Sequence, residues 1–320
     1  MSEYPTYETQ KEWHEIQSYL PKRLHFTPTH SPTEEVWHHD GHALHLDRWP
    51  NPTANVRLIL HHGMGTNGRM MSMLLGVPLH SAGFELVAID MPGYGCTVPK
   101  KDYIWDFNDW VKISSAFVDH EYETDDRPIV LYGLSAGGGL TFCSAGLNGR
   151  VKGIIGMTFM DMRIPAVSDA ACRNLFMSRI GAPSSRLMNT LGLGWFSLPM
   201  WLAGRMSTLV NNEQALQACY RDNRSANAWI TMKFMADFIT YKPAKEPAEF
   251  DVCPILLTQP AEDRWTPLWV SDMFLKDVSK VSVKKVMLDG AGHYPLEDPG
   301  LQQMSEAIIS FLKDIEGKSV

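Results

Sequence analysis

The sequence predicts an α/β protein built on a mostly parallel β-sheet with helices on both faces. Apolar runs of strand length alternate along the chain with segments of helical pattern, which is typical of such sheets. Most of the runs are continuously apolar, as strands covered on both faces should be. A length of 320 residues with 44% hydrophobic side chains is sufficient for one large core around a single sheet.

The first element is an antiparallel hairpin, because Asp40-Gly41 separates two extended segments and this pair supplies the positive φ of a tight turn. Six further strands complete an eight-stranded sheet: residues 56–62, 85–90, 128–133, 151–158, 254–259 and 282–288. Helical patterns fit between or after them: residues 69–82, 104–120, 136–147, 267–278 and 301–315.

One interval interrupts this alternation. Residues 159–250 contain helical patches separated by glycine and proline but no convincing strand. Because the interval is too long for a structureless loop in a compact domain, we expect a helical insertion after the sixth strand. The core then comprises residues 1–158 and 251–320.

Composition narrows the choice of partner. A net charge of -7 argues against nucleic acid or an anionic membrane as an electrostatic partner and favours a small-molecule substrate. The longest charge-free stretch, residues 187–204, holds too many glycines and polar residues for a membrane span. We expect this stretch to be buried or to form a surface that makes transient lipid contact.

The amino terminus lacks the basic start and apolar segment of a signal peptide, which favours a cytoplasmic protein. Its five scattered cysteines, an odd number without a CxxC pair, are interpreted as reduced core thiols. Four histidines at positions 38, 39, 42 and 45 form a cluster that resembles a metal site, but His42 and His45 would point to opposite faces of a strand. We therefore expect neither a metal nor a cofactor.

The segment "YGLSAGG" places Ser135 between a strand and a helix in the pattern GxSxG. A sharp turn there exposes the hydroxyl and requires small neighbours, as in a nucleophile elbow. The following helix directs its amino terminus at the site, so the amide of Ala136 is a candidate donor to an oxyanion. A packing role for the glycines is the alternative.

The segment "HHGMG" follows an earlier strand and can present a second backbone donor, the amide of Met64. The imidazoles of His61 and His62 are expected to end that strand and pack.

A general base is expected in "LDGAGHYPLEDP", where His293 lies in a loop after the last strand. Asp263, in "QPAEDRWTP", is the first choice for the acid that orients this histidine, since it gives the chain order serine, aspartate, histidine. Asp161 is the main rival, and Glu262 is a further alternative.

Together, the blocks "HHGMG", "AIDMPGYG", "YGLSAGG", "QPAEDRWTP" and "GAGHYPLED" resemble the α/β-hydrolase superfamily, especially its esterase and monoacylglycerol-lipase-like branch. The resemblance covers the chain from about residue 56 to its end. It implies the α/β-hydrolase fold with a helical cap formed by residues 159–250, and a turn shaped by Asp90, Gly93 and Gly95. One departure is Pro260, where members of the family usually have a glycine before the acid.

By this resemblance, a catalytic triad of Ser135, Asp263 and His293, with Met64 and Ala136 as oxyanion hole, hydrolyses carboxylic esters of hydrophobic acyl chains through an acyl-enzyme. Hydrolysis of N-acyl homoserine lactones or other lactones, thioesters or C–C bonds, and perhydrolysis, use the same machinery. A ligand-binding receptor on a hydrolase scaffold is the alternative outside enzymes.

Overall fold

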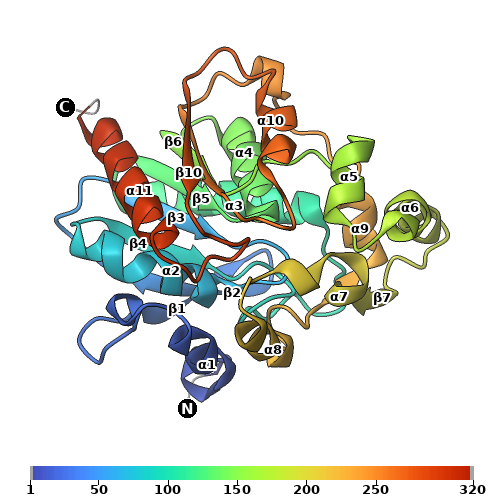
Figure 1. The fold of residues 1–320 in the computed structure, drawn as a ribbon, viewed down its shortest axis with the longest axis horizontal. Helices are drawn as coiled ribbons and strands as arrows, with labels where there is room; N and C mark the ends of the chain where they lie inside the picture. Colours follow the sequence, from blue (N-terminus) through green and yellow to red (C-terminus); the bar gives the residue numbers. More distant parts are fainter. Residues whose placement is uncertain (1–2, 318–320) are drawn as a thin grey trace.

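The computed structural model describes residues 3–317. Its centre is an eight-stranded sheet in the order β1-β2-β4-β3-β5-β6-β9-β10 (Figure 1). The strands are β1 (Thr33–His39), β2 (His42–Trp49), β3 (Arg57–His61), β4 (Glu85–Ile89), β5 (Ile129–Gly133), β6 (Gly153–Gly156), β9 (Ile255–Pro260) and β10 (Val283–Leu288). The predicted α/β class and the eight-stranded sheet are confirmed.

Two antiparallel pairings close one end of this sheet. β1 and β2 form the predicted hairpin, in which Asp40 and Gly41 both have positive φ values, 46° and 82°. β2 then runs antiparallel to β4, and all remaining pairs are parallel. The five parallel strands from β4 to β9 are fully buried, which explains their continuous apolar sequences.

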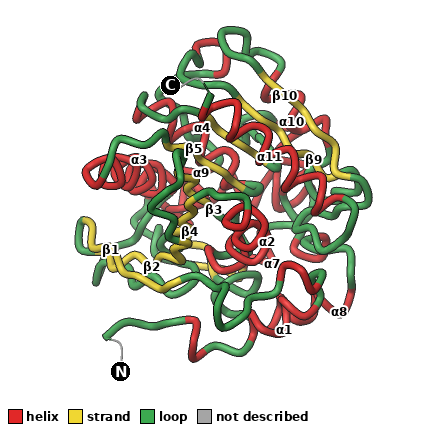
Figure 2. Tube along the Cα trace, turned by 90° about the vertical axis from the view of Figure 1, so that its left-hand side faces the viewer, coloured by secondary structure: helices red, strands yellow, loops and turns green. Residues whose placement is uncertain are grey.

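Helices cover both faces of the sheet. α3 lies on one side of the strands and α2 on the other (Figure 2). The covering helices are α2 (Gly68–Ser81), α3 (Phe107–Thr124), α4 (Ala136–Asn148), α10 (Leu268–Leu275) and α11 (Gly300–Glu316). α3 begins three residues later than predicted, because Asp106 and Asp109 form a capping box that fixes its first turn.

The amino-terminal segment adds elements that the sequence pattern did not predict. They are η1 (Tyr7–Thr9), α1 (Glu12–Ser18) and η2 (Lys22–Leu24), which precede the sheet and pack near α2. Tyr7 and Trp13 of this segment are buried. Short helices of one or two turns give too little periodicity for a sequence-based assignment.

The long connection from β6 to β9, residues 157–254, is named here the β6–β9 segment. Its elements are α5 (Pro165–Ala171), η3 (Met177–Gly181), α6 (Ala182–Thr190), β7 (Ser197–Pro199), α7 (Met200–Ala203), η4 (Met206–Thr208), α8 (Glu213–Arg221), β8 (Trp229–Thr231), α9 (Met232–Phe238) and η5 (Pro247–Glu249). Of these, α5, α6, β7, α7 and α9 lie beyond the edge of the sheet that contains the carboxyl ends of β3 and β5 (Figure 1), and the chain then returns through η5 to the start of β9.

The expectation that this interval holds no strand is wrong at β7 and β8. These two strands form an antiparallel pair of three residues each, with Pro199 opposite Trp229. Three residues cannot display the alternation that identifies a strand, and a proline argues against one. After β8, the chain becomes helical from Met232, where α9 begins.

Candidate active site

Ser135 lies at the sharp turn that joins β5 to α4. Its backbone φ and ψ are 57° and -121°, a combination that residues other than glycine rarely adopt. The turn brings β5 so close to α4 that a Cβ atom on Gly133 would overlap the carbonyl of Gly137. A Cβ on Gly63 would approach that of Ser135 to 2.9 Å. The glycines around this serine are therefore required by close approach, as predicted.

Asp263 lies in the turn after β9 and is 6% exposed. Its Oδ1 accepts hydrogen bonds from the backbone N–H groups of Trp265 and Thr266, each at 2.8 Å. Its Oδ2 lies 2.9 Å from Nδ1 of His293 and accepts the hydroxyl of Thr266 at 2.9 Å. Burial alone would raise the pKa of Asp263, but the charge and hydrogen bond of His293 and the two amides lower it below its usual value.

An ionised carboxylate can only accept hydrogen bonds, so Nδ1 of His293 carries the proton on the side of Asp263. In the neutral imidazole, Nε2 is then the acceptor. Among residues 3–317, Nε2 is buried and has no hydrogen-bond partner. Burying a polar atom without a partner is costly, and such atoms are typical of sites that complete their hydrogen bonds during function.

The two rival acids do not contact His293. Asp161 follows β6 and pairs with Arg163, at 2.7 Å between the carboxylate and the guanidinium. Glu262 is exposed beside Asp263. Pro260, which departs from the family pattern, ends β9 and is paired with Leu288 of β10, so it does not disturb the turn that holds Asp263.

A cavity opens directly beside Ser135. Its lining is mostly apolar. Met64 and Ala136, the two residues predicted to supply oxyanion donors, line the same cavity as Ser135. Trp265 also lines the cavity, and its ring centre is 4.8 Å from that of His293. The imidazole and the serine are therefore brought to the same region of the protein.

The carbonyl of Gly63 fixes the orientation of the Met64 amide. It lies 2.8 Å from Nδ1 of His62 and 3.1 Å from Oγ1 of Thr66. Nε2 of His62 accepts the N–H of Met91 at 3.0 Å, so Nδ1 of this imidazole carries the proton and donates. Because a peptide group is planar and trans, holding the Gly63 oxygen directs the Met64 N–H the opposite way.

His62 is thus a positioning residue that the sequence-based interpretation treated as packing only. Burial lowers the pKa of His62, against the opposing charge of Asp90, so the ring remains neutral. Thr266, which contacts both Asp263 and His293, was also missed. Thr266 lies three residues after Asp263, and this spacing is typical of a turn in which an aspartate accepts hydrogen bonds from the residues that follow it. The spacing is visible in the sequence and could have identified Thr266.

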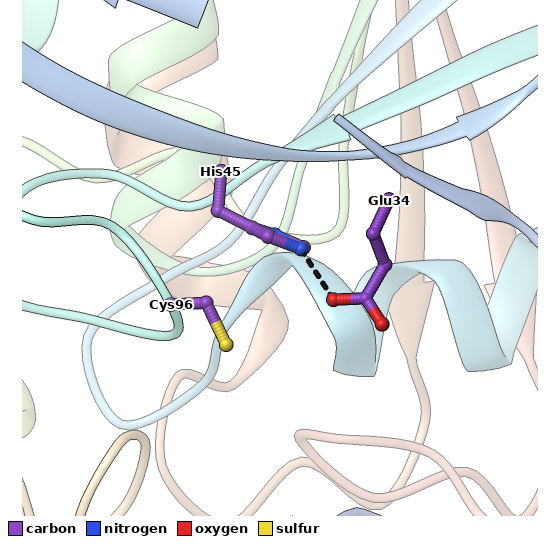
Figure 3. A group of neighbouring side chains, drawn as sticks. All are labelled: Glu34, His45 and Cys96. Atoms are coloured by element: carbon purple, nitrogen blue, oxygen red, sulfur yellow. Dashed lines mark hydrogen bonds and ion pairs between the residues drawn. The ribbon is translucent and has the colours of Figure 1, made fainter. Parts of the chain in front are cut away.

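Glu34, His45 and Cys96 form the group of potential metal ligands that the described residues bring together, with ligand atoms within 4.8 Å of one another (Figure 3). Both nitrogens of His45 are already used: Nε2 lies 2.8 Å from Glu34 and Nδ1 lies 3.1 Å from Asp90. Burial would lower the pKa of His45, but the hydrogen bonds of Asp90 and Glu34 raise it to about 10. A protonated imidazole offers no lone pair to a metal, so we assign this cluster an ionic role.

That ionic role concerns Asp90, the acid of the predicted structural turn. Its carboxylate accepts the N–H groups of Gly68 at 2.6 Å and Cys96 at 2.8 Å. A Cβ on Gly95 would overlap this carboxylate. Asp90 therefore anchors the start of α2, and with it the end of the loop that contains Met64.

The sequence matches the model of the alpha/beta hydrolase family over residues 58–302. Since this match spans most of the chain, the protein belongs to the alpha/beta hydrolase family. A comparison with curated proteins finds no significant match.

Solved structures with the same fold include three from different organisms. A soluble variant of monoglyceride lipase from Saccharomyces cerevisiae, in complex with a substrate analogue, is 18% identical with a TM-score of 0.68, covering 92% of this chain and 98% of that one. The monoacylglycerol lipase of Paleococcus ferrophilus is 20% identical with a TM-score of 0.62, covering 85% and 99%. Est1E of Butyrivibrio proteoclasticus is 17% identical with a TM-score of 0.59, covering 88% and 98%. At these identities the likeness establishes the fold.

Proposed function

We propose that this protein is a carboxylic ester hydrolase that forms an acyl-enzyme on Ser135. The observation that carries the proposal is the buried pair of Asp263 and His293, 2.9 Å apart, whose free Nε2 is held in the region of the strained serine. The three residues then act as nucleophile, base and orienting acid. Family membership and the monoglyceride lipases among proteins of the same fold support this assignment.

The proposed reaction follows from the roles of these groups. Ser135 turns toward His293 and attacks the ester carbonyl as Nε2 removes the hydroxyl proton. The carbonyl oxygen becomes an oxyanion, which accepts hydrogen bonds from the amides of Met64 and Ala136. His293 returns the proton to the leaving alcohol, and the acyl-enzyme is then cleaved by water in the same two steps. Asp263 stabilises the imidazolium that forms twice in each cycle.

The substrate is proposed to be an ester with a medium-length hydrophobic acyl chain, with a monoacylglycerol-like ester as one form. Apolar side chains supply most of the cavity wall, and unbranched methionines can adapt to a flexible chain. Six methionines line it: Met64, Met160, Met162, Met177, Met200 and Met235.

We further propose that residues 159–250 act as a cap on a core formed by residues 1–158 and 251–320. In support, one wall of the cavity belongs to the core through Ser135 and Ala136, while Met177, Met200 and Met235 come from the β6–β9 segment. The substrate would then bind between the two parts, with transient lipid contact through the cap. A cytoplasmic location is part of the proposal, supported by five buried cysteines that are all free thiols.

Labelling with a fluorophosphonate tests the nucleophile. We expect rapid labelling of the protein and its loss in Ser135→Ala and His293→Ala. Ser144→Ala is the matched control, because Ser144 is a buried serine in α4 that does not line the cavity. Labelling that persists in Ser135→Ala, or no labelling of a folded sample, would contradict the proposal and favour a ligand-binding protein.

A series of p-nitrophenyl esters of increasing acyl length, run beside acyl lactones and thioesters, tests the substrate class. We expect kcat/KM to peak at about six or more acyl carbons, because each methylene that enters the apolar cavity is removed from water. Preference for acetate would refute the acyl site. Faster turnover of lactones or thioesters would move the assignment to those reactions on the same residues.

A further inference from the structure

Large apolar side chains are exposed mainly on the β6–β9 segment. Ten of the fourteen such side chains that the structure describes in residues 3–317 lie between positions 175 and 229. They are Leu175, Phe176, Ile180, Leu187, Leu191, Leu193, Trp195, Phe196, Trp201 and Trp229, and we name this set the apolar surface. Scattered exposed apolar residues are normal, but a concentration of this size indicates an interaction site.

The apolar surface follows the local geometry of consecutive elements. Leu187 and Leu191 are four residues apart at the end of α6, and therefore share one face of that helix. Trp195 and Phe196 follow in the next loop, with ring centres 6.4 Å apart. α6, β7 and α7 lie at the end of the molecule farthest from the carboxyl-terminal helix (Figure 1). The exposed side chains thus belong to neighbouring elements at one end of the protein.

Positive charge is concentrated in the same part of the chain. Residues 170–212 contain four arginines and no acid, a formal charge of +4, whereas the whole chain has a net charge of -7. At the average acid content of the chain, a stretch of this length would hold about five acids. Arg173 and Arg186 are exposed, and Arg186 adjoins Leu187. Arg179 is also exposed but pairs with Asp169, just outside this stretch, at 2.9 Å.

The same elements form part of the cavity beside Ser135. Met177 lines the cavity from η3, while Phe176 and Ile180 of that turn are exposed. Likewise, Met200 of α7 lines the cavity and Trp201 faces solvent. One layer of short helices therefore separates the cavity from the apolar surface.

We propose that the apolar surface and its arginines dock on the anionic face of a lipid bilayer. Exposed tryptophan, phenylalanine and leucine insert at the boundary between headgroups and acyl chains, and arginines bind the anionic headgroups. Each arginine at such a surface strengthens binding about fivefold. The helices of residues 3–317 include none with the length and hydropathy of a membrane span.

The segregation of charge also orients the molecule. The net charge of the chain, which argues against an anionic membrane when taken as a whole, repels the rest of the protein from the bilayer and leaves the arginine-bearing end facing it. A lipid ester would then pass one layer of helices to reach Ser135. This delivery of substrate rests on the proposed function, whereas the docking does not.

Vesicle flotation with the intact protein tests the docking. We expect the protein to float with vesicles that contain phosphatidylglycerol, to bind pure phosphatidylcholine vesicles at least tenfold more weakly, and to lose binding as salt is raised. Tryptophan emission should shift to shorter wavelength on binding, since three exposed indoles belong to the apolar surface.

Variants with matched controls separate the contribution of the apolar side chains to vesicle binding from that of the arginines. Leu187→Ser combined with Leu191→Ser should reduce binding at least tenfold, while Leu147→Ser, at an exposed leucine outside the apolar surface, should not. Arg186→Glu should weaken binding to anionic vesicles more than tenfold, because it reverses one charge. Lys284→Glu makes the same change in charge at an exposed site on β10 and should have little effect.

Two results would overturn the proposal. Equal binding to neutral and anionic vesicles, unchanged in Arg186→Glu, would show that docking does not require anionic lipid. A stable dimer in sedimentation that dissociates in the double leucine variant would assign the apolar surface to a second copy of the chain. Hydrolysis of a soluble short-chain ester should be unchanged in all these variants. An inactive protein that still binds vesicles would refute the proposed function and leave the docking intact.

Discussion

Replacing Asp263 with asparagine tests how the candidate triad is oriented. The carboxylate has two acceptor oxygens, and each is used: Oδ1 by two backbone N–H groups and Oδ2 by Nδ1 of His293 and the hydroxyl of Thr266. An asparagine has one acceptor oxygen and one NH₂ donor. The two amides are fixed donors, so the asparagine oxygen faces them and its NH₂ group faces the imidazole.

An NH₂ group beside Nδ1 reverses the tautomer of His293. Nδ1 becomes the acceptor, the proton moves to Nε2, and the imidazole can no longer remove the proton of Ser135. We expect kcat to fall by about 10⁴, equivalent to about 5 kcal/mol of transition-state stabilisation, with KM changed little. The fold should persist, since the asparagine has the shape of the aspartate and keeps the bonds to both amides.

The assay is steady-state hydrolysis of the best p-nitrophenyl ester, with circular dichroism to verify folding. Asp161→Asn is the matched control, because Asp161 is the corresponding acid at the end of β6 and contacts Arg163 rather than His293. It should retain activity within about threefold. A folded Asp263→Asn protein with near-normal kcat, or a larger loss in Asp161→Asn, would refute this reasoning.

Three further predictions address the supports of the site. Gly133→Ala in β5 should lower the unfolding temperature by roughly 2–5 °C, because its Cβ overlaps the first turn of α4. Gly146→Ala in α4, where the nearest contact of a Cβ is at 3.6 Å, should leave the unfolding temperature unchanged, and equal melting curves for the two variants would contradict this. His62→Phe keeps an aromatic ring at this position but removes the hydrogen bond to the carbonyl of Gly63, which orients the Met64 amide. We expect kcat to fall about 10- to 100-fold at constant KM. A change in KM alone would indicate a different role. The pKa of His45 is raised to about 10, so the contribution of its charge to stability is complete below the pKa of an unfolded histidine and declines as pH rises toward 10. In His45→Gln, the free energy of unfolding measured by urea titration should lack this decline. Identical pH profiles of the free energy of unfolding for the two proteins would refute the prediction.

The sheet and its elbow could be predicted because their signals are local. Each buried parallel strand is a continuous apolar run, and the hairpin turn requires the positive φ that Asp40-Gly41 supplies. The turn at Ser135 is equally local, since its glycines are fixed by backbone contacts within a few residues and with the neighbouring strand. In these places the sequence pattern and the packing impose the same requirement.

The remaining features depend on contacts between distant segments. β7 and β8 are too short to show a period, and they form by pairing residues about thirty positions apart. The role of His62 depends on Met91, and the protonation of His45 depends on Glu34 and Asp90, which belong to other strands and turns. Such hydrogen bonds are properties of the packed structure and leave no pattern in one sequence.

The choice of the acid illustrates the limit of topology. Parallel strands end at the same edge of a sheet, so the turns after β3, β5, β6, β9 and β10 bring Met64, Ser135, Asp161, Asp263 and His293 to one rim. Topology alone therefore does not choose between the acids after β6 and those after β9. The two aspartates differ in the group that binds each carboxylate. A guanidinium two residues along the chain holds Asp161, whereas the turn after β9 aims Asp263 at an imidazole from the adjacent strand end.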